Sequence, residues 1–169
     1  RQMCIRDSGY TKLGLKKRPE TIKGLQAAAA IGQSELMFLY DKFFGEYGVV
    51  VSQLLFTSDA LRHSDGKKHL IDTFNQLFEY GSIPIVNEND SVSVEELSSG
   101  DNDSMSANVA TLINADILIL LTDTDGLYDS NPNENPDAQL IHTVEKITPE
   151  IESVAGGAGK NGTGGFITK

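Results

Sequence analysis

The run Ile83-Pro84-Ile85-Val86-Asn87-Glu88-Asn89-Asp90 joins an apolar segment directly to a cluster of carboxylates and carboxamides. A second polar cluster, Gly100-Asp101-Asn102-Asp103, follows shortly afterwards. Such side chains at the end of a buried strand suit a ligand, because α/β sheets bind ligands beyond the carboxyl ends of their strands. Two polar loops are the alternative, since Asn and Asp favour turns through local backbone hydrogen bonds. We therefore predict a strand that leads into a binding site.

Helical and strand patterns alternate on both sides of this run. Apolar side chains recur with a 3.6-residue period from Pro19 to Tyr47, which predicts a helix, and Gly32 inside it predicts close approach of another backbone segment. The β-branched, apolar stretch from Val49 to Phe56 predicts a buried strand. The other predicted elements are a helix from residue 57 or 58 to about 80 that breaks at residues 65–66, a strand at 83–86, a helix at 103–114, a strand at 117–121, a short strand at 140–141 and a short helix at 148–154.

This order of helices and strands predicts parallel strands joined by right-handed crossovers. The expected fold class is α/β, a three-layer αβα sandwich with a mainly parallel sheet, incomplete in this chain.

Composition argues against several classes of function. The 169 residues are 39% hydrophobic, which is enough for a real core. The net charge of -10 argues against binding nucleic-acid phosphates, and no apolar run approaches the roughly 20 residues that a membrane span requires. A single cysteine, Cys4, rules out an internal disulfide and a cysteine-based zinc site and fits a cytoplasmic protein. The three histidines share no ligand spacing, so no metal-binding residues are predicted.

The glycine-rich run from Gly156 to Gly165 is a candidate phosphate-binding loop, because backbone without Cβ atoms can approach a polyphosphate closely. A dinucleotide motif does not fit, because a helix rather than a strand is predicted before the run. A Walker A loop does not fit either, because Asn161 follows Lys160. Thr163 and Lys169 favour contact with a nucleotide γ-phosphate over the alternative of a flexible linker.

The turn Thr122-Asp123-Thr124-Asp125-Gly126-Leu127-Tyr128 follows the predicted strand at 117–121. A calcium loop does not fit, because Leu121 and Pro132 would occupy its first and last ligand positions. A nucleotide-contacting turn and a plain Asp-Gly turn both remain open. The sequence shows no readable Ser, His and Asp arrangement for nucleophilic hydrolysis.

Taken in order, these motifs resemble the glutamate 5-kinases, a group within the amino acid kinase family, from about Leu13 to Lys169. The segments that carry the resemblance are QAAAAIGQ at 26–33, PIVNEND at 84–90, GDND at 100–103, LLTD at 120–123, DGLY at 125–128, NPDA at 135–138 and GTGG at 162–165, with Thr168-Lys169 after it. The resemblance implies ATP-dependent phosphorylation of the side-chain carboxylate of L-glutamate, the first step of proline biosynthesis, with Mg²⁺ accompanying ATP.

The resemblance also implies roles for individual residues. The implied catalytic residues are Lys169, which binds phosphate, and Asp103, which organises the catalytic lysines. The implied amino-acid site consists of Asn87, Asp90, Asp101 and Asn102. The implied ATP contacts are Thr122, Asp123, Thr163, Gly164, Gly165, Phe166, Ile167, Thr168 and Lys169. The family further implies a homo-oligomer at full length and proline as a feedback inhibitor.

The chain departs from the family pattern in several places. The N-terminal strand with a second catalytic lysine and its Ser-Ser-Gly-Ala loop are missing, and Ser8-Gly9 is at best a remnant. Ser98 and Phe166 stand where the family usually has Lys and Met. We therefore expect residues 1–12 to be a foreign or disordered segment and residues 13–169 to be a partial catalytic domain that is inactive by itself.

Elementary chemistry agrees with the implied reaction. A carboxylate is already ionised at neutral pH, so it needs no strong base, and the protein has to align two anions and neutralise spreading charge. Asp90 is a suitable partner for the substrate ammonium group. This requires Asp90 and Asn102 to lie close together, on the same side of the molecule as Lys169.

Three alternatives stay open. Two are enzymes: the kinase half of a bifunctional pyrroline-5-carboxylate synthase, and an amino acid kinase with a different acceptor. The third is a non-catalytic module that binds a nucleotide or an amino acid.

Overall fold

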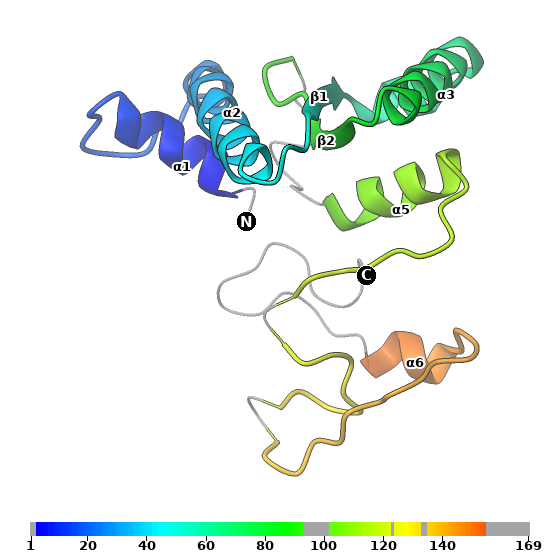
Figure 1. The fold of residues 1–169 in the computed structure, drawn as a ribbon. Helices are drawn as coiled ribbons and strands as arrows, with labels where there is room; N and C mark the ends of the chain where they lie inside the picture. The colour runs from blue at the N-terminus through cyan, green and yellow to red at the C-terminus, as the bar shows by residue number, and fades with distance from the viewer. Residues whose placement is uncertain (1–2, 93–101, 123, 133–134, 155–169) are drawn as a thin grey trace.

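The computed structural model describes residues 3–92, 102–122, 124–132 and 135–154. Its elements are α1 (Met3–Lys12), α2 (Ile22–Gly45), β1 (Val51–Phe56), the 3-10 helix η1 (Ser58–Leu61), α3 (Ser64–Glu79), β2 (Ile83–Glu88), α5 (Asn102–Leu112) and α6 (Pro149–Val154). Figure 1 shows α1 alongside α2, with the two strands between α2 and α3 in this view. None of the helices in these ranges is long and apolar enough to cross a membrane.

The two strands form a parallel pair in which Val51 lies opposite Ile83 and Phe56 lies opposite Glu88. The chain passes from β1 to β2 through η1 and α3, so the predicted α/β class and the helical crossover are confirmed. The strand β2 extends two residues beyond the prediction and includes Asn87 and Glu88. The first polar residues of the cluster therefore belong to the strand rather than to the loop after it.

The helix after β1 breaks earlier than predicted. The interruption lies at Arg62 and His63, between η1 and α3, and Asp65 and Gly66 belong to the first turn of α3. A Cβ atom at Gly66 would overlap the carbonyl oxygen of Ala60. Gly66 therefore allows the backbone of η1 to pack closely against the first turn of α3. The extended backbone of His63 precedes the first residue of α3.

The helix α2 confirms the long helix predicted from apolar periodicity. Thr21 caps it, since the Thr21 hydroxyl accepts a hydrogen bond from the backbone N–H of Gly24 at 3.3 Å. Small buried residues form one side of α2, and a Cβ at Gly32 would overlap the carbonyl oxygen of Ile5 in α1. The close backbone approach predicted at Gly32 is thus confirmed.

The residues predicted to be foreign or disordered form α1 from residue 3 onward. Ile5 is buried, and Gly9 lies directly against the backbone of Ala28. Lys12 forms an ion pair with Glu35 of α2. Disorder was therefore the wrong expectation for this segment, because the small residues of α2 offer a surface on which a helix can pack closely. A foreign origin stays a prediction.

The strand predicted at 117–121 is wrong. These residues run without strand pairing, and Ile117, Ile119 and Leu121 are 76%, 75% and 93% exposed. An apolar, β-branched run becomes a strand only where a neighbouring strand satisfies its backbone groups, and the described sheet contains only β1 and β2.

Of the two short elements predicted near the carboxyl end, the structure confirms one. The strand expected at 140–141 is only an isolated antiparallel bridge between Tyr128 and Leu140. The short helix predicted at 148–154 is confirmed as α6.

Candidate functional site

Asn87 lies near the carboxyl end of β2 and is 1% exposed. Its Nδ2 donates a hydrogen bond to Oε1 of Gln33 at 2.8 Å, and its Oδ1 accepts one from the backbone N–H of Glu88 at 2.9 Å. The Nδ2 of Asn102 donates to the same Oδ1 at 3.4 Å. A single buried amide therefore connects α2, β2 and α5.

Asn102 and Asp103 begin α5, immediately after the undescribed stretch 93–101. The structure thus brings the predicted residues Asn87 and Asn102 together, although they are 15 positions apart in sequence. Asp101, the other predicted member of this loop, lies outside the described residues. The first turn of α5 is held by the Ser106 hydroxyl, which donates to the carbonyl oxygen of Asp103 at 2.6 Å.

Asp90 follows β2 by two residues and carries a carboxylate that is only 11% exposed. Its Oδ1 accepts a hydrogen bond from Nη2 of Arg6 at 3.5 Å, in an ion pair between the β2 end and α1. In this structure the described cationic partner of the Asp90 carboxylate is Arg6, and the predicted contact with a substrate ammonium group stays a prediction. Arg6 was missed by sequence reasoning, because residues 1–12 were set aside as foreign or disordered.

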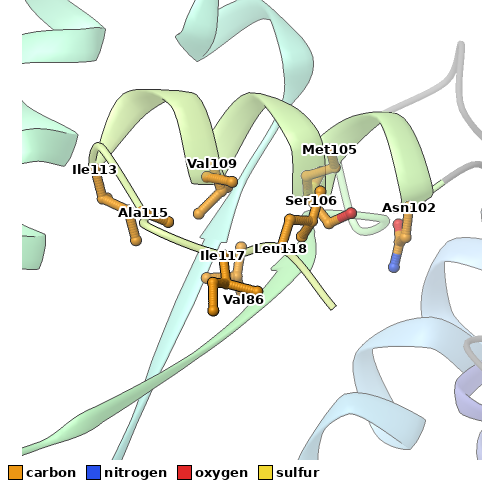
Figure 2. A pocket seen from close by; sticks show the side chains of 10 residues that line it. Val86, Asn102, Met105, Ser106, Val109, Ile113, Ala115, Ile117 and Leu118 are labelled. Carbon is orange, nitrogen blue, oxygen red and sulfur yellow. The ribbon is translucent and has the colours of Figure 1, made fainter. Parts of the chain in front are cut away.

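A cavity of about 350 Å³ lies between α5, β2 and the segment after α5. Figure 2 shows Asn102 at the N-terminal end of α5, with the apolar side chains of the helix gathered further along it. The principal apolar lining residues are Val86, Met105, Val109, Ile113, Ile117 and Leu118. The cavity thus suits apolar packing, and the polar chemistry gathers at its Asn102 end.

A second, much smaller hollow lies at the end of β2, beside α1 and α2. Ile5, Ala29, Gln33 and Leu55 border it together with the residues from Glu88 to Ser91. Gln33 and Asp90 therefore face one small space at the end of β2, between α1 and α2. Gln33 belongs to the motif at 26–33, but no role was predicted for it from the sequence. The feature that could have indicated a role is a polar residue among the small, buried residues of α2.

The predicted nucleotide half of the site is largely outside the described residues. Asp123, Thr163, Gly164, Gly165, Phe166, Ile167, Thr168 and Lys169 fall in undescribed stretches. Thr122 is described and is exposed in the unpaired segment before the turn. Within the described ranges, no group of three His, Cys, Asp or Glu side chains could hold a metal ion. The described residues thus join Asn87, Asn102 and Gln33 by hydrogen bonds, and the nucleotide contacts stay predictions.

The sequence profile of the amino acid kinase family matches residues 4–169. This chain belongs to the amino acid kinase family. Its α/β class, with a parallel strand pair that leads into a polar cluster, is the fold class expected of that family.

Three relatives with high similarity are named glutamate 5-kinase. A protein of Clostridium perfringens named glutamate 5-kinase is 54% identical over 166 residues, which cover 95% of this chain and 62% of the relative. A glutamate 5-kinase of Clostridium acetobutylicum is 54% identical over 163 residues, covering 96% of this chain and 61% of the relative. One from Listeria monocytogenes serotype 4a is 53% identical over 166 residues, covering 95% and 60%. The chain spans about three fifths of the length of these curated relatives.

Proposed function

We propose that the protein containing this chain transfers the γ-phosphoryl group of ATP to the side-chain carboxylate of L-glutamate, the first step of proline biosynthesis. The observation that carries the proposal is the hydrogen bond between Asn87 and Asn102 at the carboxyl end of β2, the strand that Asp90 follows by two residues. The chain's similarity to proteins named glutamate 5-kinase supports glutamate as the acceptor.

The amino-acid half of the proposal assigns complementary groups to the two ends of the substrate. Asp90 binds the ammonium group, because it is a carboxylate shielded from water whose contact with the Arg6 guanidinium is long, at 3.5 Å. Asn87, Asp101 and Asn102 complete the proposed site: Asn87 is buried and holds Asn102, and the Asn102 amide has a second N–H that can donate to a carboxylate oxygen. The substrate is thereby oriented as well as bound, and orientation is the larger part of catalysis when the nucleophile is already ionised.

The nucleotide half rests on the family resemblance. Asp103 organises the catalytic lysines, and Lys169 neutralises charge on the transferred phosphoryl group. Mg²⁺ would enter with ATP and neutralise the phosphate oxygens. The proposed ATP contacts are Thr122, Asp123 and the stretch 163–169. Cytoplasmic location, feedback inhibition by proline and a homo-oligomer at full length belong to the same proposal.

The test of the acceptor measures ADP release with ATP and either L-glutamate, L-aspartate or N-acetylglutamate, in a protein that carries these residues at the full length of its relatives. We expect turnover with glutamate at least about tenfold above that with the other two, because a pocket built for one set of polar contacts leaves groups unpaired with the wrong substrate. Preference for another acceptor would replace glutamate in the proposal. Binding of glutamate without ADP release would favour the non-catalytic module.

The variant Asp90→Asn tests the ammonium contact in the same assay. We expect the KM for glutamate to rise about tenfold or more while the KM for ATP changes less than about twofold, because one charge-assisted contact is lost only for the amino acid. Asp72→Asn, an exposed position on α3, is the matched control and should leave both constants unchanged. Equal constants in Asp90→Asn and the unaltered protein would remove Asp90 from the site.

A further inference from the structure

Gln33 is an unusual residue for its position on α2. Its buried neighbours are Ala28, Ala29 and Gly32, whereas Gln33 itself is a long amide that is 7% exposed. Burying an amide is unfavourable unless it is hydrogen-bonded. The Oε1 of Gln33 accepts the hydrogen bond from Nδ2 of Asn87 at 2.8 Å, the shortest of the contacts that hold Asn87. The hydrogen bond to Asn87 therefore explains why a polar residue is tolerated on the buried side of α2.

This contact is one of three that hold the Asn87 amide in its orientation. With Nδ2 directed at Gln33, the Oδ1 atom faces two donors, the backbone N–H of Glu88 and the Nδ2 of Asn102. The reverse orientation would place an NH₂ group against both donors and an oxygen against the Gln33 oxygen. The Glu88 backbone N–H, a donor that cannot turn, sets this orientation, and Gln33 supports it by presenting an oxygen to Nδ2.

We propose that Gln33 is a positioning residue of the amino-acid site: through the Asn87 amide it holds Asn102, and with it the start of α5, in the geometry that receives the substrate. The expected effect on enzyme kinetics rests on the proposed function. The expected effect on the Asn87 amide rests on the hydrogen bonds alone. A site held in its bound geometry before the substrate arrives loses less conformational entropy on binding, so the effect should appear in substrate affinity.

The Gln33 amide nitrogen supports a role at the site rather than in the core. Its Nε2 is buried and has no hydrogen-bond partner among the described residues. Gln33 also borders the small hollow that contains Asp90. Leaving a buried donor unsatisfied is unfavourable. If Gln33 served packing alone, we would expect an apolar residue at this position, because an apolar side chain has no donor to satisfy.

The first experiment measures the structural step without substrate. In ¹⁵N-labelled protein, the side-chain NH₂ signals of Asn87 report the hydrogen bond to Gln33. We expect Gln33→Met to move these signals toward those of a free amide and to speed their exchange with water at least about tenfold, since the acceptor is lost. Gln76→Met, the same change at an exposed amide of α3, should leave them in place. Unchanged Asn87 signals in Gln33→Met would overturn the inference.

The second experiment measures glutamate and ATP kinetics in the full-length protein. Gln33→Met should raise the KM for glutamate about tenfold, the size expected for one displaced hydrogen bond, with the KM for ATP within about twofold. A parallel rise in both constants, or an unchanged KM for glutamate, would contradict the inference.

The two experiments separate the inference from the proposed function. If the unaltered protein prefers another acceptor, the proposed function fails, while the Asn87 signals still decide whether Gln33 orients that amide. If Gln33→Met does not fold, Gln33→Asn shortens the side chain by one methylene and withdraws the acceptor, and the same signals decide the outcome.

Discussion

Asn87 shows how far the surroundings of one residue can differ from its local sequence pattern. Its neighbours suggest a polar turn, yet Asn87 pairs with Leu55 in the parallel sheet and is 1% exposed. An asparagine is stable there because its NH₂ group has an acceptor, Gln33, and its oxygen has two donors, the Glu88 backbone N–H and Asn102. The polar cluster was recognisable from sequence, but the division between strand and loop was not.

The variant Asn87→Asp tests whether the buried amide is required. The new carboxylate would place an oxygen against the Gln33 oxygen and a charge in a buried position, so we expect the free energy of unfolding to fall by at least about 2 kcal/mol. Urea unfolding measures the change. Asn75→Asp, at an exposed site on α3, should stay within about 0.5 kcal/mol of the original protein. A stability of Asn87→Asp equal to that of Asn75→Asp would show that the hydrogen bonds at Asn87 contribute little.

At the scale of elements, the packing of α1 on α2 decides what surrounds Gln33 and Asp90. The helices approach closely where Gly9 and Gly32 lie against the opposite backbone. This approach brings Ile5 and Arg6 of α1 to the end of β2. A helix–helix contact made through glycine therefore covers one side of the candidate site.

Gly32→Ala tests this packing. Alanine is favoured over glycine by about 1 kcal/mol within a helix, but its Cβ would overlap the Ile5 carbonyl oxygen, which belongs to backbone and cannot rotate away. We expect a net loss of about 1–3 kcal/mol in urea unfolding. Gly45→Ala, in the last turn of α2 with open space around it, should be neutral or gain up to about 1 kcal/mol. If both variants behave alike, the close contact between α1 and α2 is not formed.

At the scale of the whole molecule, the core is small and divided among the elements. The buried apolar residues of the described part are Ile5, Ala28, Ala29, Phe56, Phe74 and Met105. Large apolar side chains remain exposed elsewhere, most of all in the segment 117–121. Half of these residues lie where α1 packs on α2, and the others belong to β1, α3 and α5.

Phe74→Ala tests how much this core contributes to stability. Phe74 is 2% exposed on α3 and lies against Phe78, with ring centroids 6.1 Å apart. Loss of the ring should lower the free energy of unfolding by about 3–5 kcal/mol, because a buried cavity remains. Phe38→Ala removes the same ring from a site that is 60% exposed and should cost less than about 1 kcal/mol. Thermal or urea unfolding measures both changes. Equal losses of stability in Phe74→Ala and Phe38→Ala would show that Phe74 does not belong to the core.

The sequence by itself determined the helices α2, α3 and α5, the two strands and the polar cluster after them. Their signals are local: apolar spacing along a helix, β-branched runs, and caps within a few residues. The tertiary structure alone decided that 117–121 is not a strand and that Gln33 meets Asn87, 54 positions away. Strand pairing and a hydrogen bond between distant amides depend on which segments the fold brings together. The local sequence pattern of either segment does not contain that information.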